Sequence, residues 1–594
     1  KLSSTREDAF SVLDSNGGIN HAKALRRLDS IELYAKSDLV TQGANARPIK
    51  TVHFEYDYSL CKNYAGDASK GKLTLKKIWF SYNKNEKGKQ NPYVFSYHSS
   101  NPNYHAKRYD RWGNYKSGTG NIGNLSNSDF PYVIQDSAQA ALEAGAWNLS
   151  EIKLPSGGRM KITYEADDYA YVQNKRSAAM FGVEGFGESP IESPDVNLYR
   201  KGIIDGLPTY VSKEYMFIKG KPGVAIGTKE DIFNKYLEGH DYVYMKLAVK
   251  MPVDRWGGGY EFVPVYARVE DYGLTATPNR FWIKFKKPSK AYPTSELGDD
   301  IDLGDAIRML GSGFAEIKNV VEGFSKASKD KGWCKTVEVD KSFIRLNAPT
   351  YSKIGGGHRV KKVEIFDHWN TMTGQRESVY GQEYIYKTSI QVNGETKTIS
   401  SGVATYEPMI GNEENPFRQP IDYSERMAPL APASFLYSEM PLGESYFPGA
   451  SVGYSKVRVR TINAKAKSAN GWEETEYYTS KDFPTIVEHT VLDQDSKKRY
   501  KPKLPDLLRV YSVDRITVSQ GFKVELNDMN GKVKAQASFA ENDSINPISY
   551  VQNYYKADDE RSAVKKLNNS VWVADSVNGH INKSGIIGKD IEVM

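Results

Sequence analysis

The chain has 594 residues, of which 39% are hydrophobic and 26% charged, and its net charge is +7. This length exceeds one ordinary hydrophobic core and predicts several domains or a long repetitive β-structure. The 80 basic and 73 acidic residues are interspersed without a basic stripe, which speaks against nucleic-acid binding. No apolar run approaches the ~20 residues of a membrane helix, so an integral membrane protein is not expected.

The tyrosine and cysteine contents indicate more closely which class of protein this is. The chain has 40 tyrosines and 22 phenylalanines, a ratio that suits half-buried strands in long solvated β-sheets. Its two cysteines, Cys61 and Cys334, cannot form a metal site alone, and we expect two buried thiols, with a single disulfide as the alternative. The chain starts at Lys1, and neither end carries a signal or anchor motif, so we expect a section of a longer polypeptide.

The first 150 residues predict an antiparallel β-meander. Residues 24–34 form a strand-like apolar run, and residues 52–58 alternate between apolar and polar side chains, as in a half-buried strand. Residues 73–82 give another strand, with one slip that indicates a bulge, and residues 93–97 a third. The turns between them are rich in Asn, Gly and Lys.

Few helices are expected. A short one spans residues 137–147, and another follows Thr228, where Thr-Lys-Glu-Asp resembles a capping box. The longest spans residues 303–324, where apolar residues recur at spacings of three and four. We expect this helix to cover an open sheet edge or to plug a lumen, with contact to a membrane surface as the alternative.

Glycine pairs and runs predict turns between later strands. Residues 155–158, Pro-Ser-Gly-Gly, predict a hairpin, and Asn530-Gly531 predicts a tight hairpin between flanking strands. Gly355–Gly357 predicts a flexible hinge before a strand, and residues 452–460 predict one further strand.

These elements divide the chain into five predicted parts. They are an N-terminal β-meander (1–150), a hairpin-rich segment with short helices (151–300), a helical insertion (301–330), a β-rich segment with a proline-rich loop at 408–448 (331–465), and a C-terminal β-segment with a loosely packed end (466–594).

The most distinctive local motif is Asp110-Arg111-Trp112-Gly113, which recurs as Asp254-Arg255-Trp256-Gly257. A charged pair, a large aromatic residue and a glycine suit a turn between tyrosine-rich strands. We expect the first copy to be a structural corner, since it follows three predicted strands.

Read in order, the predicted segments resemble the region upstream of the YD repeats in large Rhs-family proteins of Bacteroidetes. They are more distantly similar to the B component of Tc toxins and to SpvB-type proteins. Residues 527–533 resemble one degenerate YD unit, but a dense array of Tyr-Asp-x-x-Gly repeats, an aspartyl autoprotease signature and a toxin domain are missing from the sequence. The segments that carry the resemblance are 24–33, 52–56, 71–78, 92–97, 109–115, 154–165, 355–363 and 401–407.

The resemblance implies a large secreted or cell-surface β-shell of which this chain is one section. Its implied partners are a binding protein or the remaining part of the same polypeptide, together with outer-membrane secretion machinery. A glycan is a further candidate partner.

No compact catalytic signature emerges from the sequence. The nine histidines form no His-x-x-x-His or His-Glu-x-x-His pair, and Gly311-Ser312-Gly313 is not a nucleophile elbow. His98, His105, His358 and His368 are therefore expected to be structural or surface residues. Asp299, Asp300, Asp302 and Asp305 suit helix capping as well as calcium.

Five aromatic residues close in sequence offer an alternative binding platform. They are Tyr97, Tyr104, Tyr109, Trp112 and Tyr115. Exposed rings of this kind can stack on sugars, but a cross-strand aromatic ladder is the expected arrangement.

We therefore expect a mainly β fold, a multi-stranded antiparallel meander forming an Rhs-like shell or propeller-like assembly. The expected function is that of a non-catalytic extracellular scaffold that binds a partner or encloses a C-terminal cargo. The alternatives are a glycan-binding adhesin and a polysaccharide-active enzyme. No catalytic, metal or cofactor-binding residue is assigned, and no cofactor is expected.

Overall fold

The computed structural model places most of the chain in β-strands. It describes residues 4–12, 19–64, 69–204, 206–250, 259–285, 330–332, 334–407, 421–425, 434–438, 451–463, 471–489, 522–525, 529–555, 570–577, 580–588 and 590–593. The predicted helix at 303–324, the Asp299–Asp305 cluster and the second Asp-Arg-Trp-Gly copy lie outside these residues.

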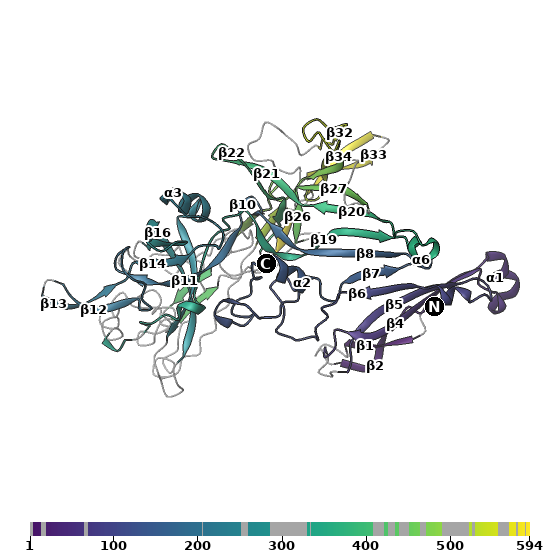
Figure 1. The fold of residues 1–594 in the computed structure, drawn as a ribbon, viewed down its shortest axis with the longest axis horizontal. Coiled ribbons are helices and arrows are strands. Elements are labelled where there is room, and N and C mark those ends of the chain that lie inside the picture. The colour runs from purple at the N-terminus through teal and green to yellow at the C-terminus, as the bar shows by residue number, and fades with distance from the viewer. Residues whose placement is uncertain are drawn as a thin grey trace.

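The dominant element is one open antiparallel sheet of twelve strands (Figure 1). Its two outer strands, β3 and β32, come from opposite ends of the chain. In spatial order the strands are β3 (Ser30–Leu33), β4 (Lys50–Leu60), β5 (Lys72–Ser81), β6 (Tyr93–Tyr97), β7 (Leu149–Lys153), β8 (Arg159–Tyr169), β19 (Lys353–Phe366), β20 (Val379–Ile385), β27 (Lys456–Asn463), β28 (Trp472–Tyr477), β31 (Val533–Phe539) and β32 (Ser549–Gln552).

The second large element is a closed six-stranded barrel, inserted in the chain between β8 and β19. Its interior holds the main hydrophobic core, where Phe281, Ile283 and Val265 are fully buried. In order around the barrel, the strands are β11 (Ala178–Gly187), β14 (Tyr215–Lys219), β17 (Arg280–Phe285), β16 (Tyr260–Leu274), β15 (Tyr242–Lys250) and β18 (Phe343–Asn347).

Smaller sheets and hairpins complete the fold. Strands β10 (Lys175–Arg176), β9 (Tyr171–Val172), β23 (Gly402–Ala404) and β26 (Val452–Tyr454) form a four-stranded sheet, and β29 (Ile486–His489), β30 (Phe522–Glu525) and β35 (Asp590–Val593) a three-stranded one. The two-stranded units are β1 (Ser4–Val12) with β2 (Ile19–Arg27), β12 (Tyr199–Ile204) with β13 (Leu207–Ser212), β21 (Lys387–Val392) with β22 (Glu395–Ser400), β24 (Ile421–Glu425) with β25 (Ser434–Ser438), and β33 (Ser570–Val577) with β34 (His580–Gly588).

The helices of the described residues are short. They are α1 (Lys36–Gln42), η1 (Gly43–Asn45), η2 (Lys87–Gln90), η3 (Ile122–Asn124), α2 (Ser137–Ala144), α3 (Lys229–Ile232), the π-helical turn η4 (Phe233–Leu237), η5 (Val339–Lys341) and α6 (Trp369–Thr373). Two of them follow their predicted signals. Asp136 caps α2, and Thr228 with Asp231 forms the predicted capping box of α3.

The two faces of the twelve-stranded sheet differ in chemistry. Cross-strand pairs such as Phe95 with Ile152 and Val363 with Ile162 put apolar side chains on one face, which we call the apolar face. Its members are Ile31, Val52, Phe54, Ile78, Phe80, Tyr93, Phe95, Ile152, Met160, Ile162, Val363, Ile365, Tyr380, Tyr384, Val457 and Val459. The other face carries charged residues, including the paired Lys161 and Glu364.

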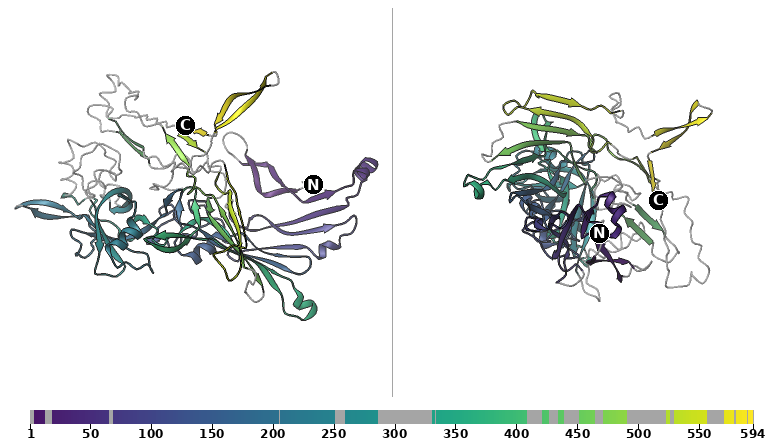
Figure 2. Two further views of the ribbon diagram at one scale, coloured as in Figure 1. Left: turned by 90° about the horizontal axis from the view of Figure 1, so that it is seen from above. Right: turned by 90° about the vertical axis from the view of Figure 1, so that its right-hand side faces the viewer.

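The connections of the sheet are also asymmetric. At one end, shorter connections join β3 to β4, β5 to β6, β7 to β8 and β19 to β20, and this end carries α1 and α6 in Figure 1. At the opposite end, the connections from β6 to β7, from β8 to β19 and from β20 to β27 are much longer, and the second of these contains the barrel. Figure 2 shows the later strands, green to yellow, turning away from the plane of the first purple strands.

The predicted mainly β fold and several predicted strands are confirmed. The strands at 52–58, 73–82 and 93–97 form β4 to β6, and a register shift between Glu55 and Tyr56 provides the bulge. Pro155–Gly158 closes the β7–β8 hairpin, where Leu154 N–H donates to the Gly158 carbonyl at 2.7 Å.

Other local predictions are wrong. Asn530-Gly531 makes a turn, but the strands on its two sides do not pair, since β30 joins β29 and β35 while β31 joins β28 and β32. The runs at 24–34 and 452–460 are each divided between two strands of different sheets. Gly355–Gly357 is no hinge before a strand, because it lies inside β19. The expectation of two buried thiols is confirmed in part, since Cys61 and Cys334 form no disulfide bond with each other and Cys334 is buried, but Cys61 is only half-buried.

Candidate functional site

The first Asp-Arg-Trp-Gly motif forms a corner closed by its own aspartate. Tyr109 and Tyr115 pair across the corner, and the buried Asp110 carboxylate accepts hydrogen bonds from the backbone N–H groups of Trp112 (3.0 Å) and Asn114 (2.9 Å). Gly113 has φ +84°, a conformation that favours glycine. The motif therefore folds locally, as the sequence predicts for a corner.

This corner packs against a bulge in the central strand β19. Between two paired positions, Gly355, Gly356 and Gly357 face the single residue Asp167 of β8. All three glycines have positive φ, at +155°, +101° and +139°. A Cβ atom on Gly355 would lie 2.9 Å from the Trp112 ring, so the glycine lets the tryptophan approach the backbone.

A network of charged side chains lies beside the bulge and centres on Asp168. Its carboxylate accepts hydrogen bonds from Arg359 Nη1 (2.5 Å), Ser352 Oγ (2.8 Å), Ser400 Oγ (2.9 Å) and Lys387 Nζ (3.2 Å). Burial by itself would raise the pKa of Asp168, but the charges of Arg359 and Lys387 outweigh it and lower the pKa. This carboxylate is therefore ionised and saturated with donors from the chain itself.

The neighbouring Asp167 behaves in the opposite way. Its main partner is the hydroxyl of Tyr454, which donates to Oδ1 at 2.5 Å. Burial raises the pKa of Asp167 to about 6, and the nearby Asp168 charge acts in the same direction. The pKa values of two adjacent aspartates of one strand are thus shifted in opposite directions, because Arg359 and Lys387 together outweigh the effect of burial only at Asp168.

A second ion pair is buried where the barrel chain enters the sheet. Lys353, just before the bulge, bonds Glu407, and their side chains are 2% and 0% exposed. The Tyr169 hydroxyl donates to the same Glu407 oxygen at 2.5 Å. These three side chains connect β8, β19 and the segment after β23, so the pair holds the sheet and the four-stranded unit together.

A small cavity of about 20 Å³ lies between the corner, the bulge and α2. Asp110, Lys116 and Glu143 contribute its ionisable groups. Burial raises the pKa of Asp110 to about 6 and lowers the pKa of Lys116 to about 8. Lys116 donates to the backbone carbonyls of Phe130 (2.9 Å) and Tyr132. A cavity of this size holds roughly one water molecule, which excludes a sugar ring from it.

We call the corner, the bulge and these polar side chains the junction. Buried ionisable groups with shifted pKa values are the usual markers of a catalytic centre. Here, however, most of their hydrogen bonds are made to neighbouring strands and loops, and the cavity admits only a water molecule. The arrangement is chemically suited to holding the sheet, the four-stranded unit and the β21–β22 hairpin together.

The residues singled out by the sequence are not brought together into one site. His358 lies edge-on to Tyr164 at 5.1 Å, and its pKa is lowered by burial, whereas His368 stands at the N-cap position of α6 with φ +67° and makes no capping hydrogen bond with its side chain. Trp112 and Tyr115 pack inward, against Tyr169 (6.4 Å) and Trp147 (5.3 Å) respectively, so they form no exposed platform for a sugar.

Sequence reasoning missed the residues that build the junction, above all Asp167, Asp168, Arg359, Lys353 and Glu407. One signal for the first two was available. Residues 160–165 alternate along a strand, and two consecutive aspartates then interrupt the pattern and place one carboxylate on each face.

The described residues offer neither a metal-binding cluster nor a membrane-spanning helix. No group of three His, Cys, Asp or Glu side chains within the described ranges is arranged to hold a metal ion. In the same part of the chain, the helices are all too short or too polar to span a bilayer.

Fold and site together define a mainly β protein in which a closed barrel is joined to a long open antiparallel sheet. Comparison with protein-family models, curated proteins and solved structures finds no match for this chain.

Proposed function

We propose that this chain is a non-catalytic β-scaffold, one wall section of a large Rhs-like secreted or surface protein. The observation that carries the proposal is the apolar face of the twelve-stranded sheet. It continues across nine neighbouring strands, from Ile31 on β3 to Val459 on β27. In a finished protein such a face is covered, because exposed apolar area is costly in water.

The side chains of this face are incompletely buried, which supports the proposal that another layer covers the face in a larger protein. Phe95, Ile152, Ile162 and Val363 are each only half-buried, whereas the interior of the barrel is fully buried. Within the described residues the sheet thus lacks the second layer that a β-sandwich would supply. We propose that the remaining part of a larger polypeptide, or its cargo, covers the apolar face.

The junction supports the same proposal from another direction. Its buried ion pairs join β8 and β19 of the sheet to each other and to the segment after β23, beside the points where the chain leaves the sheet for the barrel and returns. A buried charge is tolerated only if it is paired. Separating one partner of a junction ion pair would leave the other charge buried and unpaired, which is costly. A wall section that keeps its shape without a bound ligand needs buried polar interactions of this kind between its parts.

The proposal can be tested by comparing thiol reactivity on the two faces of the sheet. Cysteines are introduced singly at Ile162 and Val363 on the apolar face, and at the paired Lys161 and Glu364 on the charged face, in a Cys61→Ser background. We expect a membrane-impermeant maleimide to label all four in the isolated chain. In the whole protein it should label only the charged-face pair.

The matched pairs sit at adjacent positions of the same two strands, so local backbone opening affects both equally. Equal labelling of the two faces in the whole protein would mean that the apolar face is uncovered, and the scaffold proposal would fail.

A further inference from the structure

The outermost point of the sheet's short-loop end is a protrusion formed by two adjacent connections. Residues 34–50 contain α1 and join β3 to β4, and residues 82–90 lie between β5 and β6. The backbone N–H of Asn83 donates to the Ile49 carbonyl at 3.3 Å, which ties the two connections together. We call these residues the α1 tip, and Figures 1 and 2 show α1 extending beyond the other elements at that end.

The α1 tip exposes several apolar side chains to solvent. No residue of α1 is buried, and Val40 is 77% exposed. Leu39 on the same helix is 47% exposed, and Ile49 and Tyr82 beside it are 52% and 55% exposed. Scattered exposed apolar residues are ordinary, but four on one protrusion are a concentration.

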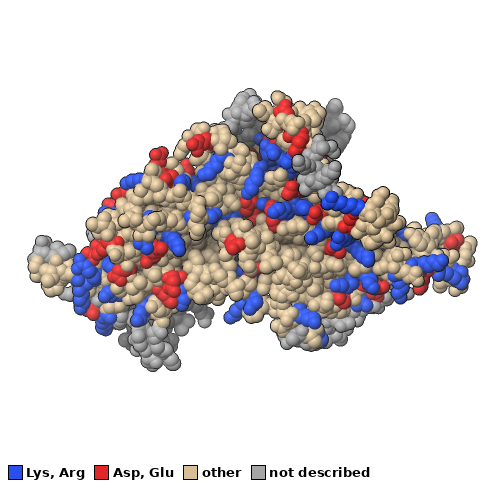
Figure 3. All heavy atoms as spheres, viewed as in Figure 1, with Lys and Arg blue, Asp and Glu red and all other residues tan. Residues whose placement is uncertain are grey.

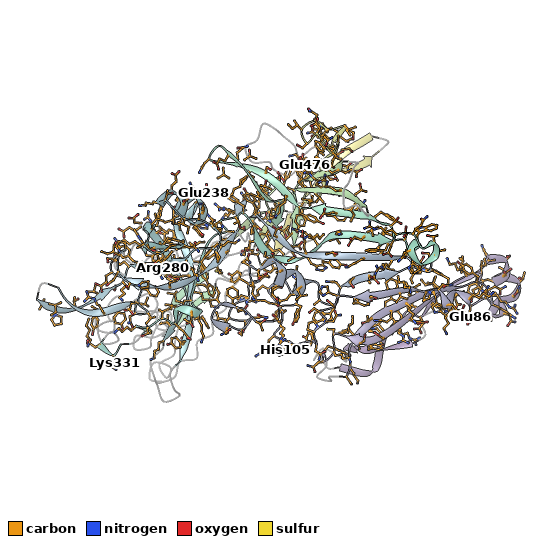
Figure 4. All side chains as sticks on the ribbon, viewed as in Figure 1. Glu86, His105, Glu238, Arg280, Lys331 and Glu476 are labelled. Carbon is orange, nitrogen blue, oxygen red and sulfur yellow. The ribbon has the colours of Figure 1, made fainter. Side chains whose placement is uncertain are left out.

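The same protrusion is rich in positive charge. It holds six basic residues, Lys36, Arg47, Lys50, Lys84, Lys87 and Lys89, but only two acidic ones, Asp38 and Glu86. In the described part of the chain, none of these six cations lies in an ion pair. Figure 4 labels Glu86 at this end of the molecule, and Figure 3 shows blue basic side chains there with fewer red ones.

The shape of the α1 tip favours a lipid surface over a protein partner. Protein interfaces concentrate their binding energy in pockets filled by aromatic or Arg anchors. The tip is instead a protruding helix whose aliphatic side chains stand among lysines. Aliphatic residues that enter the headgroup region, with long basic side chains reaching to the phosphates, are typical of peripheral membrane contact.

We infer that the α1 tip binds the surface of an anionic lipid bilayer, with Leu39 and Val40 entering the interface and the six basic side chains contacting acidic headgroups. This contact is independent of the scaffold role, since it uses the loop end of the sheet and reaches the apolar face only at Lys50, whose ammonium lies over the Phe80 ring. It would orient the sheet with its strands pointing away from the membrane.

Sedimentation with lipid vesicles tests the inference. We expect the chain to sediment with vesicles of phosphatidylcholine and phosphatidylserine, to stay in solution with phosphatidylcholine alone, and to be released by added salt. The double variant Leu39→Asp/Val40→Asp should bind the mixed vesicles at least about tenfold more weakly.

A matched control lies at the opposite end of the molecule. Ile203 and Leu207 on the β12–β13 hairpin are 75% and 70% exposed. The variant Ile203→Asp/Leu207→Asp therefore changes net charge by the same amount and should bind as the parent does. Circular dichroism confirms folding of both variants.

Three outcomes would overturn the inference. They are no difference between the two vesicle types, an equal loss in the β12–β13 control, or a lipid-independent drop in oligomer mass on changing Leu39 and Val40. The last result would identify the α1 tip as a contact between protein chains.

Discussion

The barrel and the twelve-stranded sheet differ in how they pair their edge strands and in how far they bury their apolar side chains. The barrel closes on itself, so its strands have no free edge, and its interior residues Phe281, Ile283 and Val265 are fully buried. The sheet stays open at β3 and β32, and the residues of its apolar face are half-buried or exposed. The barrel is complete by itself, whereas the sheet needs another layer.

This difference implies that the barrel contributes most of the stability, whereas the sheet contributes most of the surface available for contact. A core that is sealed from water contributes most of the free energy of folding, since burial of apolar area is the main favourable term. A long half-covered sheet contributes less for each strand but offers a large area for contact. The junction lies on β8 and β19, where the chain leaves the sheet for the barrel and returns to it.

The largest expected effect comes from truncating matched phenylalanines in the two regions. Phe281 is 0% exposed and lies 5.0 Å from the Tyr236 ring, whereas Phe95 is half-buried on the sheet. We expect Phe281→Ala to lower the free energy of unfolding by about 3 to 5 kcal/mol. Phe95→Ala should lower it by only about 1 to 2 kcal/mol in the isolated chain.

Guanidinium denaturation of both variants measures this contrast. Similar losses would mean that the sheet is as well packed as the barrel. In the whole protein the loss for Phe95→Ala should grow, because the proposed covering layer buries the ring.

A smaller effect is expected at the bulge that couples the two regions. Gly356 has φ +101°, and a Cβ atom there would lie 2.4 Å from Val452 Cγ2. Gly356→Ala therefore combines backbone strain with a clash, and we expect a loss of about 2 to 3 kcal/mol. Gly394→Ala is the control, since Gly394 has φ +83° with open space around it and should lose only about 1 kcal/mol.

Thermal unfolding followed by circular dichroism compares the two glycine variants. If Gly394→Ala is the more damaging, the bulge is not a constrained element. If Gly356→Ala is the more damaging but Phe281 stays protected from hydrogen exchange, the barrel has kept its fold while the junction loosened.

The sequence predicted local structure well where the pattern itself determines it. Period-two alternation gave β4 and β6, Thr228 and Asp231 gave the cap of α3, and Asp110 with Gly113 gave a corner. In each case the determining interactions lie within a few residues of one another, so the local sequence is enough to predict the structure.

Pairing between distant segments was much harder to foresee. Asn530-Gly531 turns the chain as expected, yet β30 pairs with β29 and β35 because strand partners are chosen by the whole sheet. The junction likewise joins Asp168 to Arg359, Ser352 and Ser400. These residues are far apart in the sequence and meet where β8 pairs with β19, so no local signal connects them.

The smallest expected effect is a pH dependence confined to the junction. Asp167 has an ordinary pKa of 3.8 when unfolded and about 6 in the folded chain, where burial raises it. Between about pH 4 and 6 the folded state thus retains a proton that the unfolded state has lost. The free energy of unfolding should therefore fall as pH rises through this window, by about 1 to 3 kcal/mol for this group.

Asp167→Asn removes that titration and keeps an oxygen that can accept from Tyr454, so denaturation midpoints measured between pH 4 and 6 should vary less than in the parent. Asp110, with its pKa also raised to about 6, accounts for a second share of the slope that Asp110→Asn should remove. Hydrogen bonds from Asn546 and Ile545 lower the pKa of Asp543 below its usual value, so Asp543→Asn should leave the window unchanged. A slope that survives both junction variants would place the titrating groups elsewhere, and the junction would then be a fastening without pH sensitivity.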